Sequence, residues 1–165
     1  MERLPVALGG FMGTGKSTIG PRVARHLGLD FVDLDRVVEA EAGCSVAALF
    51  EAEGEAGFRA RERLALERIV AGPPVVLSLG GGTLHQAGNR VLLEGRYRVI
   101  ILDLSWPMVR RRLGGRSNRP LAGDSERLYL ERRPGYLQAG TVVSVERKTL
   151  GQAARAVLQA LGEVA

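Results

Sequence analysis

The sequence contains a single cysteine, only two histidines and almost no lysine. Cys44 has no partner for an internal disulfide and excludes an all-cysteine metal site, so we expect it to be a small buried hydrophobe. His26 and His85 lie far apart and lack the carboxylate spacing of a metal site or a catalytic triad. We expect both histidines at the surface or in supporting positions, and a metal site or a catalytic triad built on them is disfavoured.

Long apolar runs and aromatic residues are also scarce. No run approaches the ~18 apolar residues that a membrane span needs, and no signal-peptide pattern opens the chain. We therefore expect a cytoplasmic protein without a membrane partner. Aromatic residues make up 5% of the chain, and many of its arginines are interleaved with glutamates. Despite the net charge of +5, nucleic acid is therefore not an expected partner.

A phosphate-binding loop stands out against this background. Residues 10–18 read Gly-Phe-Met-Gly-Thr-Gly-Lys-Ser-Thr and directly follow the apolar run Leu4–Leu8. The spacing G-x-x-x-x-G-K-[ST] places backbone amides around phosphates, a lysine at the β- and γ-phosphates, and a hydroxyl at Mg²⁺. The residues expected to hold the nucleotide are Gly13, Thr14, Gly15, Lys16, Ser17 and Thr18. Only two of the 23 basic residues are lysines, which makes a chance match improbable. The chain is predicted to bind a nucleoside triphosphate.

Five short apolar runs alternate with helical patterns, which is typical of an α/β protein with a parallel sheet flanked by helices. The predicted strands are Leu4–Leu8, Phe31–Leu34, Val75–Leu79, Val99–Leu104 and Thr141–Val145. A length of 165 residues fits one domain, taken as residues 1–165. Residues 113–124 contain three glycines, one proline and two arginines without helical periodicity. We interpret this segment as a mobile lid.

Several cues predict where the helices begin and end. The apolar stripe Ile19, Val23 and Leu27 stops at Gly28, which is a typical residue just beyond a helix C-terminus. We expect Ser45 to open another helix and a longer helix to cover 58–70. Ser105 precedes a Trp-Pro helix start, and 149–152 form a capping box ahead of the last helix.

Two aspartates close the second predicted strand. Asp33 and Asp35 are two residues apart, which would put both carboxylates on one strand face at the edge where ligands bind. One would support a metal ion beside Ser17, and the other would accept a hydrogen bond from an acceptor hydroxyl. Alternatively, one of them caps a helix that starts near Arg36. The third strand ends in three glycines instead of an aspartate, which favours Asp33 as the metal partner and predicts close approach of residues 80–82 to a ligand.

In order along the chain, these motifs resemble those of shikimate kinase. The further matching segments are Gly54-Glu-Ala-Gly-Phe-Arg-Ala-Arg-Glu62, Asn89-Arg90, Arg119-Pro-Leu121 and Arg132-Arg-Pro-Gly-Tyr136. The resemblance implies a P-loop kinase with a five-stranded parallel sheet of order 2-3-1-4-5. It also implies transfer of the γ-phosphoryl group of ATP, with Mg²⁺, to the 3-hydroxyl of shikimate, on the route to chorismate and the aromatic amino acids.

The resemblance also assigns roles. It implies that Lys16 holds phosphate, Ser17 ligates Mg²⁺, and Asp33 supports the metal through water. Asp35 would receive the shikimate hydroxyls and act as base, Arg59 and Arg132 would bind the shikimate carboxylate, and the Gly81 backbone would contact shikimate. Arg119 matches the lid arginine that closes onto ATP. Arg111 and Lys148 are the candidates for the adenine contact.

The sequence departs from the family pattern at two places, and three alternative functions remain. Gly135 stands where the family commonly has leucine, and Val-Ser-Val replaces Val-Asp-Thr at residues 143–145. The alternatives are a gluconate kinase-like enzyme, a relative that binds ligands without turnover, and an NTPase that binds nucleic acid. Intact Lys16, Ser17 and Asp33 oppose the non-catalytic alternative. We expect a monomer whose partners are shikimate and ATP.

Overall fold

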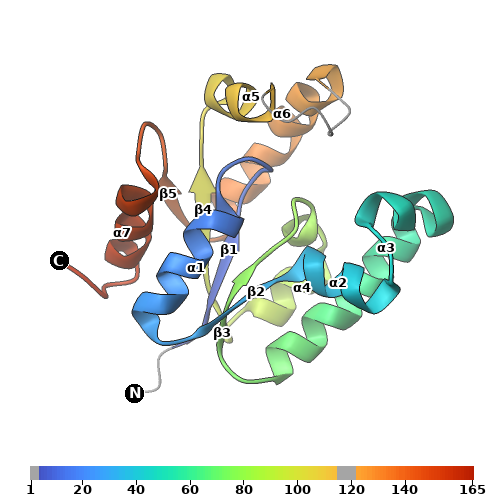
Figure 1. Ribbon diagram of the computed structural model, residues 1–165, viewed down its shortest axis with the longest axis horizontal. Helices are drawn as coiled ribbons and strands as arrows, with labels where there is room; N and C mark the ends of the chain where they lie inside the picture. The colour runs from blue at the N-terminus through green and yellow to red at the C-terminus, as the bar shows by residue number, and fades with distance from the viewer. Residues whose placement is uncertain (1–3, 115–121) are drawn as a thin grey trace.

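A five-stranded parallel sheet forms the centre of the computed structural model, which describes residues 4–114 and 122–165 (Figure 1). The strands are β1 (Val6–Gly9), β2 (Asp30–Asp33), β3 (Val75–Ser78), β4 (Arg98–Asp103) and β5 (Thr141–Ser144). Their order is β2-β3-β1-β4-β5. The expected α/β class, the strand order and the positions of all five strands are confirmed, with bounds that differ by one or two residues.

The sheet buries its central strands on both faces. β1 pairs in parallel with β3, where Val6 lies opposite Val76, and with β4, where Val6 lies opposite Arg98. Every residue of β1 and β3 is buried, as expected for strands that are covered by helices on both sides. Because all strands run in the same direction, their carboxyl ends meet at one edge, and the loops after β1, β2 and β3 converge there.

Among the described residues, seven α-helices and one 3₁₀ helix lie between the strands or follow the last one. They are α1 (Lys16–Leu27), α2 (Leu34–Ala42), α3 (Val46–Ala71), η1 (Thr83–His85), α4 (Ala87–Leu93), α5 (Trp106–Gly114), α6 (Ala122–Ala139) and α7 (Leu150–Ala160). Their ends follow the sequence cues: Gly28 ends α1 in the left-handed conformation, and Ser45 caps α3. The predicted capping box of Thr149 and Gln152 opens α7. The two helical stretches expected after Ser45 form one element, interrupted at Gly54 (φ 70°, ψ −177°).

The structure differs from two expectations, on Cys44 and on residues 113–124. Cys44 is exposed, so its expected burial is wrong: it lies in the turn after Gly43, while Val38 and Leu49 from the flanking helices fill the core. Residues 113–124 are in part helical, since α5 extends to Gly114 and α6 begins at Ala122. The middle of that predicted lid, including Arg119, lies outside the described residues. Of the helices described, none is long and apolar enough to cross a membrane.

Candidate active site

The phosphate-binding loop joins β1 to α1, as its sequence predicts. Its backbone curls tightly at Gly10, where φ is 132° and a Cβ atom would lie 2.5 Å from the Leu102 carbonyl oxygen. Lys16 Nζ donates to the carbonyl oxygens of Gly10 (2.6 Å) and Phe11 (3.1 Å). The N-terminus of α1 has no capping side chain and no acidic residue in its first turn. The positive end of its dipole is therefore available to an anion in the loop.

Ser17 and Asp33 face each other across the ends of α1 and β2. Ser17 Oγ donates to Asp33 Oδ2 at 3.1 Å, while Asp33 Oδ1 accepts from the backbone amides of Asp35 (3.1 Å) and Arg36 (3.3 Å). Asp33 thus caps α2 with one oxygen and meets Ser17 with the other, so the capping alternative is confirmed, while the metal-supporting role stays a prediction. A hydroxyl and a carboxylate are hard oxygen ligands that suit Mg²⁺. Within residues 4–114 and 122–165 no three His, Cys, Asp or Glu residues gather as a metal site.

Asp35 reaches the same edge from a helix and not from a strand. The expected shared strand face is wrong, because Asp33 ends β2 and starts α2, which places Asp35 in the first helical turn. Burial is the main reason that the pKa of Asp35 rises from 3.8 to about 6, and the negative charges of Asp33 and Glu62 add to the shift. Lys16 opposes the shift. A carboxylate with this pKa remains largely ionised at neutral pH and is a competent proton acceptor.

The turn after β3 brings three of the predicted acceptor-site side chains together. A Cβ atom on Gly80 would lie 2.8 Å from Asp35 Oδ1, and one on Gly81 would lie 3.4 Å from Arg132 Nη1. A Cβ atom on Gly82 would overlap the guanidinium of Arg59. A side chain at position 80 or 82 would displace Asp35 or Arg59, whereas a Cβ atom at position 81 would make ordinary contact with Arg132.

A buried glutamate fixes the position of Arg59. Glu62 is fully buried and accepts from Arg59 Nη1 and from Thr83 Oγ1, both at 2.9 Å. The i,i+3 spacing of the two residues on α3 brings Glu62 and Arg59 together. Sequence reasoning missed Thr83; its only signal was a hydroxyl directly after the three glycines. With both oxygens of Glu62 engaged, the Arg59 guanidinium is held rigidly at the turn.

α6 brings Arg132 and Tyr136 to the opposite side of the glycine turn. The Tyr136 hydroxyl donates to the Gly81 carbonyl oxygen. Burial raises the pKa of Tyr136 to about 12, which the Arg132 charge partly opposes. Tyr136 was part of the recognised motif, but its sequence did not reveal this contact with the turn.

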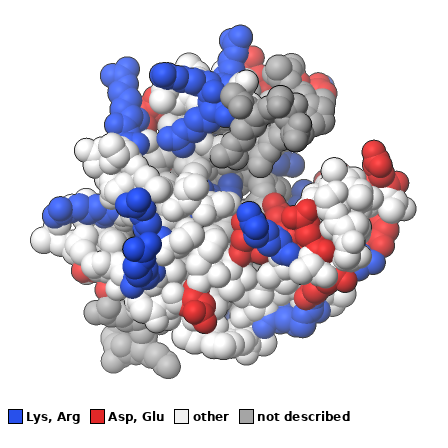
Figure 2. All heavy atoms as spheres, viewed as in Figure 1, with Lys and Arg blue, Asp and Glu red and all other residues white. Residues whose placement is uncertain are grey.

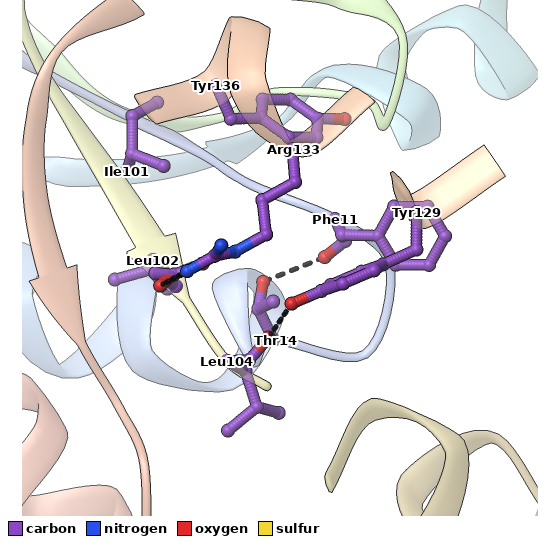
Figure 3. Close-up of a pocket in the computed structure, with 9 residues that line it drawn as sticks. Phe11, Thr14, Ile101, Leu102, Leu104, Tyr129, Arg133 and Tyr136 are labelled. Carbon is purple, nitrogen blue, oxygen red and sulfur yellow. Dashed lines mark hydrogen bonds and ion pairs between the residues drawn. The ribbon is translucent and has the colours of Figure 1, made fainter. Parts of the chain in front are cut away.

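A small pocket beside the phosphate-binding loop shows how α6 is anchored (Figure 3). Arg133 makes a two-pronged ion pair with Asp103 at the end of β4, through Nε (3.0 Å) and Nη2 (2.8 Å). The Tyr129 hydroxyl donates to the Leu104 carbonyl oxygen at 2.8 Å, and its ring meets Phe11 of the loop edge-on. These contacts tie α6 to both β4 and the phosphate-binding loop. Nothing in the sequence distinguishes Arg133 from the many other arginines.

The candidate adenine residues lie apart from these clusters. Arg111 is exposed on α5, whereas its neighbour Arg112, which was not predicted, donates to the Gly13 carbonyl oxygen at 3.1 Å. Lys148 lies in the turn between β5 and α7, which is tied to α5 because Glu146 accepts from the Ser105 amide and hydroxyl. Figure 2 shows blue basic side chains over the α5 region and red acidic ones around α2 and α3. The roles of Arg111 and Lys148 stay predictions.

Comparison with known proteins identifies the family. A family model described as "Shikimate kinase" matches residues 12–162. The shikimate kinase of Bordetella avium is 41% identical over 146 residues, which cover 85% of this chain and 70% of that protein. That of Symbiobacterium thermophilum is 39% identical over 167 residues and 96% of both chains. A solved structure of Acinetobacter baumannii shikimate kinase in complex with shikimate has a TM-score of 0.83 and 32% identity, covering 98% of this chain and 92% of that one. The chain belongs to the shikimate kinase family.

Proposed function

We propose that this protein transfers the γ-phosphoryl group of ATP to the 3-hydroxyl of shikimate, giving shikimate 3-phosphate and ADP. The observation that carries the proposal is the convergence of Asp35, Arg59 and Arg132 on one glycine turn beside a phosphate-binding loop. The acceptor has one carboxylate and several hydroxyls, which match two guanidinium groups and a carboxylate base. Membership of the family supports the same reaction.

On the nucleotide side, the loop amides and Lys16 bind the phosphates of ATP. Ser17 and Asp33 hold Mg²⁺, which neutralises phosphate charge when it is bound. Arg111 and Lys148 contact the adenine, and Arg119, in the part of the chain outside the described residues, closes onto ATP. Phosphoryl transfer makes few covalent demands on a protein, so positioning and charge neutralisation by these groups supply the catalysis.

On the acceptor side, Arg59 and Arg132 bind the carboxylate of shikimate, because planar guanidinium groups bind carboxylates through paired hydrogen bonds. The backbone of Gly81 lies against the ring. Asp35 aims the reacting hydroxyl and accepts its proton late in a loose transition state, which its pKa of about 6 permits at neutral pH. Because one chain supplies every residue of this site that the structure describes, we propose that the protein acts as a monomer, and we propose separately that it is cytoplasmic.

ADP release measured with and without shikimate tests the proposal, with phosphorus NMR to identify the product. We expect release that depends on shikimate and a new phosphate monoester resonance. Gluconate is the comparison acceptor, since a gluconate kinase-like enzyme would respond to it. Shikimate binding in calorimetry without ADP release would instead favour a relative without turnover, and ADP release stimulated only by DNA would favour a nucleic-acid NTPase.

A further inference from the structure

His85 is a half-buried histidine that the proposed reaction does not use. It ends η1, the short helix that directly follows the glycine turn. Both ring nitrogens are buried, and neither forms a hydrogen bond of normal geometry with any residue in the described part of the chain. Buried polar atoms without partners are rare in folded proteins because they lose their hydrogen bonds to water. The ring must therefore owe its position to packing.

The packing partners of His85 are two consecutive residues of α6. The imidazole meets the Tyr136 ring edge-on, with centroids 4.9 Å apart and an interplanar angle of 89°. A Cβ atom on Gly135 would lie 3.3 Å from His85 Nε2, which is tighter than ordinary van der Waals contact. The imidazole thus occupies the space beside α6 that a side chain at position 135 would need.

The charges around His85 keep the ring neutral. Burial lowers the pKa of His85 below its usual value, and the cationic groups of Arg132 on α6, Arg90 on α4 and Arg59 on α3 lower it further. A weak contact with the Arg132 backbone only partly opposes these effects. At neutral pH the side chain packs uncharged between η1 and α6, and it adds no further positive charge beside Arg59 and Arg132.

We propose that His85 is a positioning residue for the acceptor site and forms a size-matched pair with Gly135. Seated over Gly135 and against Tyr136, the imidazole sets the distance between the glycine turn and α6. That distance is what lets Tyr136 bind the Gly81 carbonyl and brings Arg132 beside the same turn. The inference rests on the proposed function, since it assigns the consequence to shikimate binding.

A double-mutant cycle of His85→Ala and Gly135→Leu tests the pair. We expect Gly135→Leu to raise the KM for shikimate about tenfold, because the new side chain and the imidazole compete for one space. His85→Ala alone is expected to raise it about threefold by leaving a gap, while the KM for ATP changes less than about twofold in both variants. The double variant should bind shikimate better than Gly135→Leu alone, because the smaller residue at position 85 makes room for leucine.

Two controls separate this pairing from general effects of the substitutions. Gly151→Leu also puts leucine on a helix, but a Cβ atom there meets only Arg22, at 3.8 Å, and His26→Ala removes an exposed histidine. Both should leave the KM for shikimate unchanged. The proposal would be overturned if the double variant raised the KM for shikimate by at least the product of the two single-variant increases. An equal rise in the KM for ATP would also overturn it.

Thermal unfolding supplies a readout that does not need activity. The Tm of the double variant should exceed that of Gly135→Leu if the two positions share one space. If the unmodified protein shows no shikimate-dependent ADP release, the proposed function fails, whereas the Tm cycle still decides the pairing. Should His85→Ala lower the Tm of the Gly135→Leu variant further, the size-matched pair is refuted.

Discussion

The two halves of the site are built in different ways. The phosphate-binding part of the nucleotide half comes from one contiguous loop of nine residues, 10–18, which includes Lys16. The acceptor half is assembled from side chains on α2, α3 and α6 around the turn after β3. Its parts lie up to a hundred residues apart, so their spacing depends on how helices pack. The nucleotide half is therefore sensitive to a few local substitutions, and the acceptor half also to changes outside the site.

The largest expected effect is in the nucleotide half. Lys16→Met should reduce kcat by about a thousandfold or more, because loss of a phosphate-directed charge in a closed site costs about 4 kcal/mol or more of transition-state stabilisation. Steady-state ADP release measures it, and Arg155→Met on the exposed side of α7 is the control. Near-normal kcat in a folded Lys16→Met protein would contradict the assignment of the loop.

In the acceptor half, removal of either guanidinium group should weaken the binding of shikimate and leave that of ATP unchanged. Arg59→Ala and Arg132→Ala are each expected to raise the KM for shikimate about 30- to 150-fold, as loss of a charge-assisted hydrogen bond of about 2–3 kcal/mol implies. The KM for ATP should change little. Arg61→Ala on the same helix is the matched control, since that side chain pairs with Glu53 at the surface. Calorimetry that finds normal shikimate binding in either variant would remove that arginine from the site.

Burial of Asp35 should lower the free energy of unfolding of the protein at neutral pH relative to acid pH. Its folded pKa of about 6 exceeds the usual 3.8, so the folded state favours the protonated form. That stabilisation is complete below about pH 4 and is lost as the pH rises through 6. Asp35→Asn should therefore lose turnover but unfold with about 1–3 kcal/mol more free energy than the unmodified protein at pH 8. In urea titrations this advantage should shrink towards pH 4; an advantage independent of pH would contradict the burial of an ionised Asp35.

The smallest expected effect tests the anchoring of α6. Arg133→Ala removes the ion pair with Asp103 and should raise the KM for shikimate about two- to fivefold by loosening Arg132. The loss of stability should be only about 0.5–1 kcal/mol, because the Arg133 side chain is 43% exposed. Arg127→Ala, whose ion pair with Glu131 lies at the surface of the same helix, is the control. Equal effects of the two variants on shikimate KM would show that the Asp103 pair does not position Arg132.

The contrast between local features and those assembled from distant elements also explains which parts could be predicted from the sequence. The strands, the capping residues and the phosphate-binding loop depend on neighbours in the chain, and their positions were predicted to within one or two residues. Glu62 was found beside Arg59 because one helical turn separates them. Thr83, Tyr136 and Arg133 depend on packing between distant elements, which no local pattern encodes. The helical position of Asp35 was missed because the Asp33 side chain, by capping α2, ends the strand early.

The two contacts of the Asp33 side chain restrict which residues can occupy position 33. One oxygen meets Ser17, and the other accepts the amides that begin α2 and so fix where Asp35 emerges. Glutamate would preserve the charge, but its longer side chain is a poor N-cap, and asparagine would preserve the cap while giving up the charge. Glutamate at position 33 would therefore weaken chiefly the acceptor half, and asparagine chiefly the nucleotide half. Position 33 should therefore tolerate fewer replacements than either function alone would require.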